Sequence, residues 1–120
     1  MSQGIFGIGC DIVDVSRFAA QLEKSPGLKA RLFTSAEIGL PLRSLAARFA
    51  AKEALIKALG GDHGLRWHDI EVPRVADERP SFSATATLQQ RLADLGVARL
   101  HLSLSHETET AIAYVVAEGG

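Results

Sequence analysis

Residues 42–60 read LRSLAARFAAKEALIKALG and carry the strongest structural pattern in this sequence. Large apolar side chains recur along the segment at the spacing of one helix face: Leu45, Phe49, Ile56 and Leu59. This period predicts one long central helix from about Leu42 to Leu59, which Gly60-Gly61 ends. Lys52 falls in the middle of the apolar stripe, so its ammonium group needs either an exit to solvent or a buried partner.

The adjoining face of the same predicted helix combines small and charged side chains: Ala46, Ala50, Glu53 and Lys57. The small alanines would let this helix approach a neighbouring strand closely. Glu53 and Lys57 are also four positions apart, in the order that favours an exposed helical ion pair worth about 0.2–0.5 kcal/mol. An ordinary surface pair is therefore one interpretation of these two residues, and part of a functional site is the other.

Residues 4–13, GIFGIGCDIV, are predicted to form a strand with two unlike faces. One face carries Ile5, Gly7, Gly9, Asp11 and Val13, and it is almost bare beside Asp11 because Gly7 and Gly9 have no side chains. If the long helix packs on this face, Glu53 would stand near Asp11, and a hard divalent cation such as magnesium would offset the repulsion between the two carboxylates. From spacing alone the plainer interpretation, that Asp11 is the polar end of a strand, is favoured, because nothing local shows that the two residues meet.

The rest of the chain contains shorter elements. Helices are predicted from a cap at Asp14 or Ser16 to about Lys24, in a capping-box segment at residues 34–37, and from Thr85 or Thr87 to Leu95. Strands are predicted at residues 70–72, 80–83, 99–106 and 111–117, the last two as a hairpin. These elements predict a single α+β domain over residues 1–120, in which an antiparallel sheet packs against helices.

Composition limits the classes of function. The 120 residues are 47% hydrophobic and 22% charged, which is typical of a globular protein with a core. Thirteen basic against fourteen acidic side chains give a net charge of −1, which argues against bulk electrostatic binding to nucleic acid or to an anionic membrane. The apolar start of the chain is interrupted at Asp11 and lacks a basic flank, so neither a signal peptide nor a membrane span is expected. The protein is therefore expected to be cytoplasmic.

Other candidate sites are weaker. The glycines at 4, 7 and 9 lie inside the predicted strand, whereas a dinucleotide-binding glycine motif opens a helix after a strand. The four histidines, at 63, 68, 101 and 106, lack zinc spacing, and the single cysteine, Cys10, can neither complete a zinc site nor form an intrachain disulfide. Cys10 is expected to be a small buried side chain. Ser105 and His106 are neighbours in a strand and point to opposite faces, so they do not form a catalytic pair.

Two blocks of sequence resemble one known family. GIGCDIVD at residues 7–14 is similar to the opening motif of the holo-acyl-carrier-protein synthases, and RFAAKEALIKALG at residues 48–60 resembles the helix signature of that family. Weaker similarities lie at FTSAE (33–37) and LSLSH (102–106). The order and spacing match from about residue 5 to residue 118.

The resemblance implies a 4′-phosphopantetheinyl transferase. Such enzymes move phosphopantetheine from coenzyme A to a serine of an apo acyl carrier protein or carrier domain, release adenosine 3′,5′-bisphosphate, and serve fatty acid or related biosynthesis. By position, Asp11 and Glu53 would be the magnesium ligands and catalytic residues, with Glu53 helping to deprotonate the carrier serine. The family is typically a homotrimer that binds coenzyme A at subunit boundaries.

The same resemblance implies roles for other positions. Arg48, Lys57 and His106 would hold coenzyme A phosphates, and Gly60 and Pro80 would line its path. Arg17 would meet the acidic recognition helix of the carrier, although an ordinary exposed helix arginine is the competing interpretation. Two other functions remain open at this point: a non-catalytic carrier-binding trimer, and a metal-dependent hydrolase of nucleotide-like pyrophosphates.

The sequence departs from the family pattern at several positions. Asp14 replaces the usual glutamate, and the family's Gly-Thr-Gly after the long helix is Gly60-Gly61-Asp62 here. The segment Asp77-Glu78-Arg79-Pro80 lacks the usual glycine, and the segment before Arg48 is short. These departures affect the surroundings of coenzyme A and of the carrier, while the core positions are retained.

Overall fold

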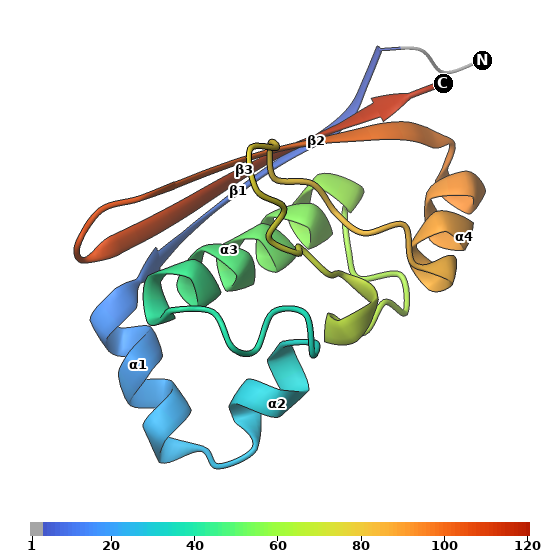
Figure 1. Ribbon diagram of the computed structural model, residues 1–120. Helices are drawn as coiled ribbons and strands as arrows, with labels where there is room; N and C mark the ends of the chain where they lie inside the picture. The colour runs from blue at the N-terminus through green and yellow to red at the C-terminus, as the bar shows by residue number, and fades with distance from the viewer. Residues whose placement is uncertain (1–3) are drawn as a thin grey trace.

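The long helix packs across one face of a three-stranded antiparallel sheet. A computed structural model of the protein describes residues 4–120, in which α3 spans Leu42–Leu59, the range expected from its apolar period. The strands are β1 (Gly4–Asp14), β2 (Val97–His106) and β3 (Thr110–Gly119), and the sheet order β1-β3-β2 places β3 in the centre (Figure 1). β1 and β2 are therefore the two edges of the sheet.

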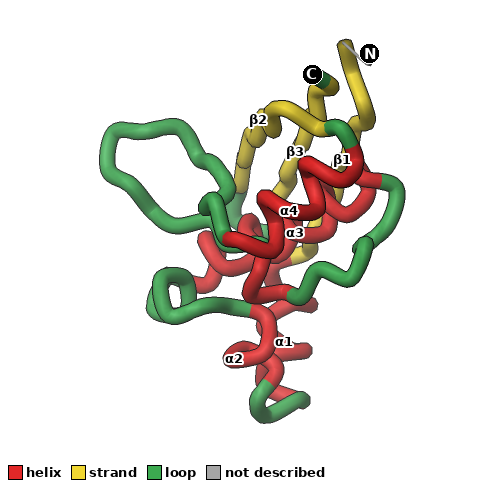
Figure 2. The backbone as a smooth tube through the Cα atoms, turned by 90° about the vertical axis from the view of Figure 1, so that its right-hand side faces the viewer, coloured by secondary structure: helices red, strands yellow, loops and turns green. Residues whose placement is uncertain are grey.

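The shorter helices lie on the same side of the sheet as α3 (Figure 1). They are α1 (Val15–Lys24), α2 (Leu28–Leu32), the 3-10 turn η1 (Trp67–Asp69) and α4 (Ala86–Leu95). Of the two predicted caps for α1, the structure uses Asp14, whose carboxylate accepts a hydrogen bond from the Arg17 amide at 2.9 Å. α1 and α2 lie together at one end of the molecule, and the strands lie at the other (Figure 2). Within residues 4–120, no helix has the length and apolar character needed to cross a membrane.

The bare face of β1 is the face that α3 covers. A Cβ atom added to Gly9 would lie 1.8 Å from the Ala54 carbonyl oxygen, and one added to Gly7 would lie 1.9 Å from that of Ala58. Real side chains do not tolerate such distances, so the backbones of β1 and α3 approach as closely as they do only because both positions are glycine. The predicted packing of the helix against this face is confirmed.

This close approach makes Gly9→Ala strongly destabilising. The added methyl group meets backbone atoms that cannot rotate away, so β1 and α3 must separate, and overpacking of this kind costs about 1–3 kcal/mol or more. Gly39→Ala is the matched control, because no atom lies within 4 Å of the added Cβ there. Denaturant unfolding followed by circular dichroism should show the loss for Gly9→Ala and almost none for Gly39→Ala; equal stability of the two variants would contradict the observed packing.

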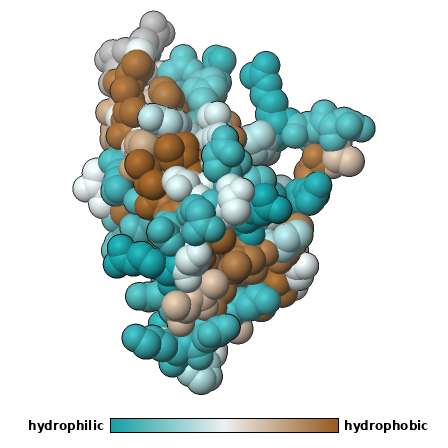
Figure 3. All heavy atoms as spheres, turned by 90° about the vertical axis from the view of Figure 1, so that its left-hand side faces the viewer, coloured by the Kyte–Doolittle hydropathy of each residue, from teal (hydrophilic) through white to brown (hydrophobic). Residues whose placement is uncertain are grey.

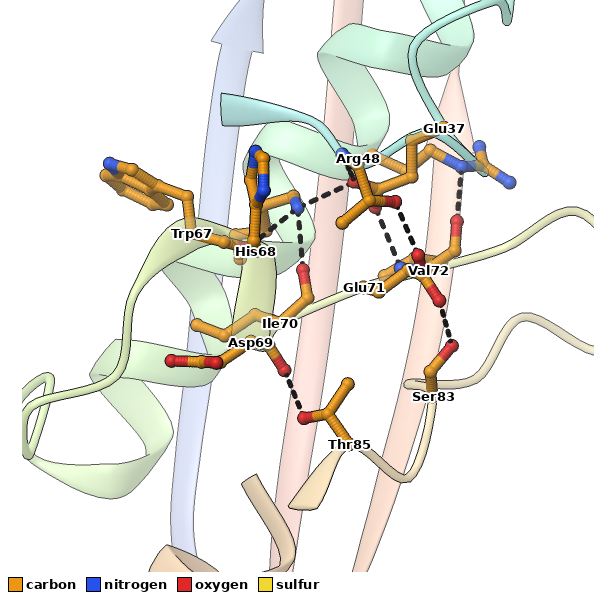
Figure 4. Close-up of polar contacts among 12 residues, drawn as sticks. Glu37, Arg48, Trp67, His68, Asp69, Ile70, Glu71, Val72, Ser83 and Thr85 are labelled. Carbon is orange, nitrogen blue, oxygen red and sulfur yellow. Dashed lines mark hydrogen bonds and ion pairs between the residues drawn. The ribbon is translucent and has the colours of Figure 1, made fainter. Parts of the chain in front are cut away.

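Three predicted short elements are wrong. Residues 70–72 and 80–83 are not strands, and residues 34–37 form a turn rather than a helix. Neither segment pairs with an edge of the three-stranded sheet, and residues 70–72 are bound instead by side chains of α3. Side chains replace the missing strand: Lys52, Glu37, Arg48 and Thr85 bind the backbone of residues 67–72 (Figure 4). The helix α2 was not predicted and occupies part of the segment after α1.

The face of the sheet that α3 leaves uncovered is apolar. Ile8, Ile12 and Tyr114 are 60%, 64% and 51% exposed and share this open face of β1 and β3. Cys10 also lies there, opposite Tyr114, and is half-buried rather than buried as expected. Figure 3 shows apolar atoms gathered at the end of the molecule where β1 begins. A surface of this kind on a small domain is typical of a protein–protein interface.

Candidate functional site

The two predicted metal ligands line one hollow. A groove of about 520 Å³ lies between β1, α1, α2 and α3, and we call it the α1 groove. Residues important to its chemistry are Asp11, Arg17, Phe18, Phe49, Glu53 and Trp67. Asp11 comes from β1 and Glu53 from α3, so the close contact between these elements is what brings the two carboxylates together.

The electrostatics of the groove indicate that the two carboxylates interact. The pKa of Glu53 is raised above its ordinary value, first by burial and second by the negative charge of Asp11, while Lys57 acts in the opposite direction. Lys57 Nζ lies 3.0 Å from Asp11 Oδ1 and donates a hydrogen bond to the Cys10 carbonyl oxygen, also at 3.0 Å. The hydrogen bond to Asp11 is the largest cause of the raised pKa of Lys57. In the described part of the chain, Lys57 thus pairs with Asp11 across the two elements, not with Glu53 along the helix.

This arrangement fits a hard divalent cation that is held partly by substrate. Among residues 4–120, no group of three or more His, Cys, Asp or Glu side chains is placed to hold a metal ion. Asp11 and Glu53 offer carboxylate oxygens only, and their mutual repulsion is what a cation would relieve. Magnesium commonly takes one or two carboxylates and completes its shell with substrate phosphate and water, so two ligands from this chain suit it.

A second, cationic hollow lies at the other edge of the sheet. It measures about 350 Å³, and we call it the β2 hollow. Its polar lining residues are Arg48, Arg74, Arg79, His106, Asp77 and Glu78, and Pro80 and Leu104 also line it. The side chain of Arg48 is buried, and its Nε donates to the Val72 carbonyl oxygen at 2.8 Å. Burial is the largest cause of its lowered pKa, and the nearby charge of Arg74 lowers it further. The three arginines outnumber the two carboxylates, so the hollow has an excess of positive charge that favours the binding of an anion.

The predicted site residues are therefore divided. Asp11, Glu53 and Arg17 line the α1 groove, with Lys57 against Asp11, whereas Arg48, Pro80 and His106 line the β2 hollow. Arg48 and Glu53 lie five positions apart on α3, which places them about 140° apart around its axis. Gly60 lines neither hollow and ends α3 in the left-handed conformation, with φ of 81°. One copy of the chain does not bring all the predicted residues to one place.

A buried ion pair between Lys52 and Glu37 lies behind the α1 groove, and only Lys52 was singled out from the sequence as needing a partner. Lys52 and Glu37 are both 0% exposed, and Lys52 Nζ lies 2.8 Å from Glu37 Oε1 (Figure 4). The sequence indicated that Lys52 needs a partner, and Glu37 was expected only as a helix-capping residue. Glu37 Oε1 does accept the Thr34 amide at 3.0 Å, which is half of a capping box around a turn. No local signal connects positions 37 and 52.

Other lining residues were also missed. Arg31 and Trp67 line the α1 groove, and Arg74 and Arg79 line the β2 hollow. All four lie outside the predicted active-site helix and strand, in α2, in η1 or in the loop after it, where spacing alone does not indicate which face a side chain will meet.

Comparisons with known proteins identify the family of the chain. Residues 7–115 match the family model of the 4′-phosphopantetheinyl transferase superfamily. The chain is 56% identical over 116 residues to a holo-acyl-carrier-protein synthase of Micrococcus luteus, which covers 95% of this chain and 92% of that protein. Its fold is similar to that of the Neisseria meningitidis synthase, with a TM-score of 0.84, 37% identity, and coverage of 95% of this chain and 98% of that one.

A second similar structure contains a ligand. It is the Helicobacter pylori holo-acyl-carrier-protein synthase in complex with coenzyme A, with a TM-score of 0.80, 29% identity, and coverage of 92% of this chain and 99% of that one. These matches span nearly the whole length of the sequence and include both motif blocks. The chain therefore belongs to the 4′-phosphopantetheinyl transferase superfamily, as an enzyme of the holo-acyl-carrier-protein synthase family.

Proposed function

We propose that this enzyme transfers the 4′-phosphopantetheine group of coenzyme A to a serine of an apo acyl carrier protein or carrier domain, and that it requires magnesium. The single observation that carries the proposal is the convergence of Asp11, Glu53 and Lys57 where β1 crosses α3, in a groove bordered by Arg17. The setting is fatty acid or related biosynthesis in the cytoplasm.

In the proposed reaction the serine Oγ attacks the phosphorus that bears the pantetheine arm. The bond from that phosphorus to the oxygen of adenosine 3′,5′-bisphosphate breaks, and this product leaves with the oxygen. Glu53 accepts the serine proton, directly or through water, as the general base of the reaction. Bound magnesium, held by Asp11 and Glu53, would supply positive charge that orients the pyrophosphate and offsets charge developing during transfer.

Two cations complete the proposed roles in the α1 groove. The Lys57 ammonium group, which is half-exposed beside Asp11, would donate a hydrogen bond to a pyrophosphate oxygen. Arg17 is exposed at the rim of the groove, where it would attract the acidic recognition helix of a carrier. This contact is local, so it is compatible with a net charge of −1 for the chain.

Mass spectrometry of the carrier tests the function. Incubation of the enzyme with coenzyme A, magnesium and a panel of apo carriers should add one phosphopantetheine to at least one carrier. No carrier should be modified when magnesium is removed with a chelator. The absence of any modified carrier would contradict the proposal. Release of adenosine 3′,5′-bisphosphate without a carrier would instead favour a pyrophosphate hydrolase.

Lys57→Ala should weaken the use of coenzyme A. Loss of a hydrogen bond to a charged group costs about 1.5–3 kcal/mol, so we expect kcat/KM for coenzyme A to fall roughly 10- to 100-fold. The fold should persist, because Lys57 is half-exposed and its stem is not part of the core. Steady-state kinetics with varied coenzyme A measure this effect, and unchanged kcat/KM would reject the assignment of Lys57.

A homotrimer that binds coenzyme A between subunits is the second part of the proposal. It is supported by the apolar open face of the sheet and by the division of the predicted residues between opposite sheet edges. A cyclic head-to-tail assembly would bring the β2 edge of one copy to the β1 edge of the next. Arg48, Pro80 and His106 of one copy would then face the α1 groove of its neighbour across one coenzyme A molecule.

Mixing two inactive variants tests the shared site. We expect Glu53→Gln and His106→Ala each to have little activity alone, because every boundary then contains one defective half. Co-refolding them in equal amounts should form mixed trimers in which about a quarter of the boundaries have both halves intact, and activity should return to that extent. No recovery, together with a monomeric mass by light scattering, would contradict a site formed between copies.

A further inference from the structure

The ion pair of Lys52 and Glu37 organises a segment that has no regular structure of its own. Lys52 Nζ donates to the carbonyl oxygens of Trp67 at 3.1 Å and Ile70 at 2.6 Å, in addition to its contact with Glu37. Glu37 Oε2 accepts the Val72 amide at 2.8 Å. The backbone from residue 67 to residue 72 is thus held by two buried charged side chains in place of a neighbouring strand (Figure 4).

The same contacts place one wall of the α1 groove. The ring of Trp67 lies 5.7 Å from that of Phe49, and the ring of Phe49 stacks on that of Phe18 at 5.3 Å. All three rings line the α1 groove together with Glu53, which follows Lys52 directly in the sequence. Because the Trp67 backbone is bound to Lys52 Nζ, a single buried cation links the aromatic wall to the helix that carries Glu53.

Lys52 itself does not line the groove that it supports. It is 0% exposed, and its ammonium group already has three oxygen partners plus the face of Phe33, whose ring centre is 5.5 Å away. Within residues 4–120, every buried side-chain nitrogen and oxygen has a hydrogen-bond partner. A side chain enclosed in this way acts on a substrate only through the residues that it holds.

We propose that Lys52 is a positioning residue for carrier recognition: it fixes the Trp67–Phe49–Phe18 wall opposite Asp11, so that the α1 groove has the width required by the serine-bearing segment of the carrier. This proposal rests on the proposed function. It assigns to Lys52 an effect on the KM for the carrier rather than on the chemical step, because the residue holds a wall of the groove and touches none of the reacting atoms.

Trp67 reports directly on this wall, because it is the single tryptophan of the chain. In Lys52→Met we expect its fluorescence to shift to longer wavelength and its quenching by acrylamide to rise at least about twofold, since the freed segment admits solvent. The variant Lys52→Met/Glu37→Gln leaves no unpaired carboxylate in the core and provides the same measurement if the single variant does not fold. Arg91→Met is the matched control: it removes a cation that binds a loop carbonyl, that of His63, on the other side of η1.

Kinetics separate positioning from mere support of the fold. At a temperature where circular dichroism shows a native signal, the folded Lys52 variant should raise the KM for an apo carrier at least about tenfold and change kcat less than about threefold. Trp67→Ala, which retains the backbone carbonyl bound by Lys52, should raise the same KM, and combining it with the Lys52 variant should add little further because both act through one wall.

The possible outcomes are distinct. If the Trp67 signal and the carrier KM of the folded variants equal those of the wild type, Lys52 supports stability alone and the proposal is wrong. A changed Trp67 signal with an unchanged KM also overturns it, because the wall would then play no part in recognition. If the wild-type enzyme modifies no carrier, the proposed function fails first, and that result is independent of the fluorescence measurement.

Discussion

Glu53→Gln should lower kcat for phosphopantetheine transfer by about a thousandfold or more. Loss of a general base alone costs about 100- to 10,000-fold, and the substitution also removes a charged oxygen from the proposed magnesium site. The change in volume is small, so the α1 groove keeps its shape. Single-turnover transfer to an apo carrier, followed by mass spectrometry, measures the effect without interference from product release.

The same substitution should leave the fold intact or slightly more stable. A carboxyl group whose pKa is raised on folding disfavours the folded state at neutral pH, where it is charged, so a neutral amide removes an unfavourable interaction with Asp11. Asp94→Asn on the surface of α4 is the control, since it makes an equivalent change of charge far from the groove. Full activity in Glu53→Gln would mean that the metal and the base lie elsewhere.

Lys52→Met should produce the largest loss of stability of any single substitution discussed. Removing one partner from a buried ion pair costs about 3–5 kcal/mol, because the other charge remains buried without compensation. Here Lys52 and Glu37 are both fully buried, and three oxygen atoms lose their donor. For a chain of this length the midpoint of thermal unfolding should fall by roughly 10–20 °C.

The second partner gives an internal check on this prediction. The loss of unfolding free energy in Lys52→Met/Glu37→Gln should be smaller than the sum of the losses in the two single variants. The reason is that the double variant no longer buries an isolated charge. Denaturant unfolding at one fixed protein concentration measures all three variants, which is necessary for a protein proposed to assemble. Strict additivity would show that the two side chains stabilise the fold independently, contrary to their 2.8 Å contact.

The parts of the fold that sequence could predict are those whose signals are local. The period of α3, the caps at Asp14 and Thr85, and the alternation of β2 each depend on neighbours within a few residues, and these elements were found near their expected boundaries. Residues 70–72 show the limit of such signals. Their alternation favoured a strand, but whether a strand forms depends on a free sheet edge beside it, and the order of strands is a long-range property.

The candidate site shows the same division. The bare face beside Asp11 was predicted because two glycines mark it in the sequence. Spacing alone did not favour a meeting of Asp11 and Glu53, which was a conditional expectation until the family resemblance implied it; in the structure both line the α1 groove. The separation of His106 from these carboxylates could not be predicted from local signals. It arises because β3, the last strand in the chain, lies between β1 and β2 and places them at opposite edges of the sheet. The position of Arg48 on another side of α3 from Glu53 does follow from their spacing of five residues.

The glycine contacts between β1 and α3 fix the distance between the two backbone segments that carry the carboxylates. Gly9 meets the backbone of Ala54, which is next to Glu53, and Asp11 lies two residues beyond Gly9. Main-chain atoms in contact have no rotamers to exchange, so the spacing between the elements that carry Asp11 and Glu53 does not depend on how nearby side chains happen to pack. Substitutions elsewhere in the core can therefore lower the stability of the protein while the backbones at Asp11 and Glu53 keep their separation.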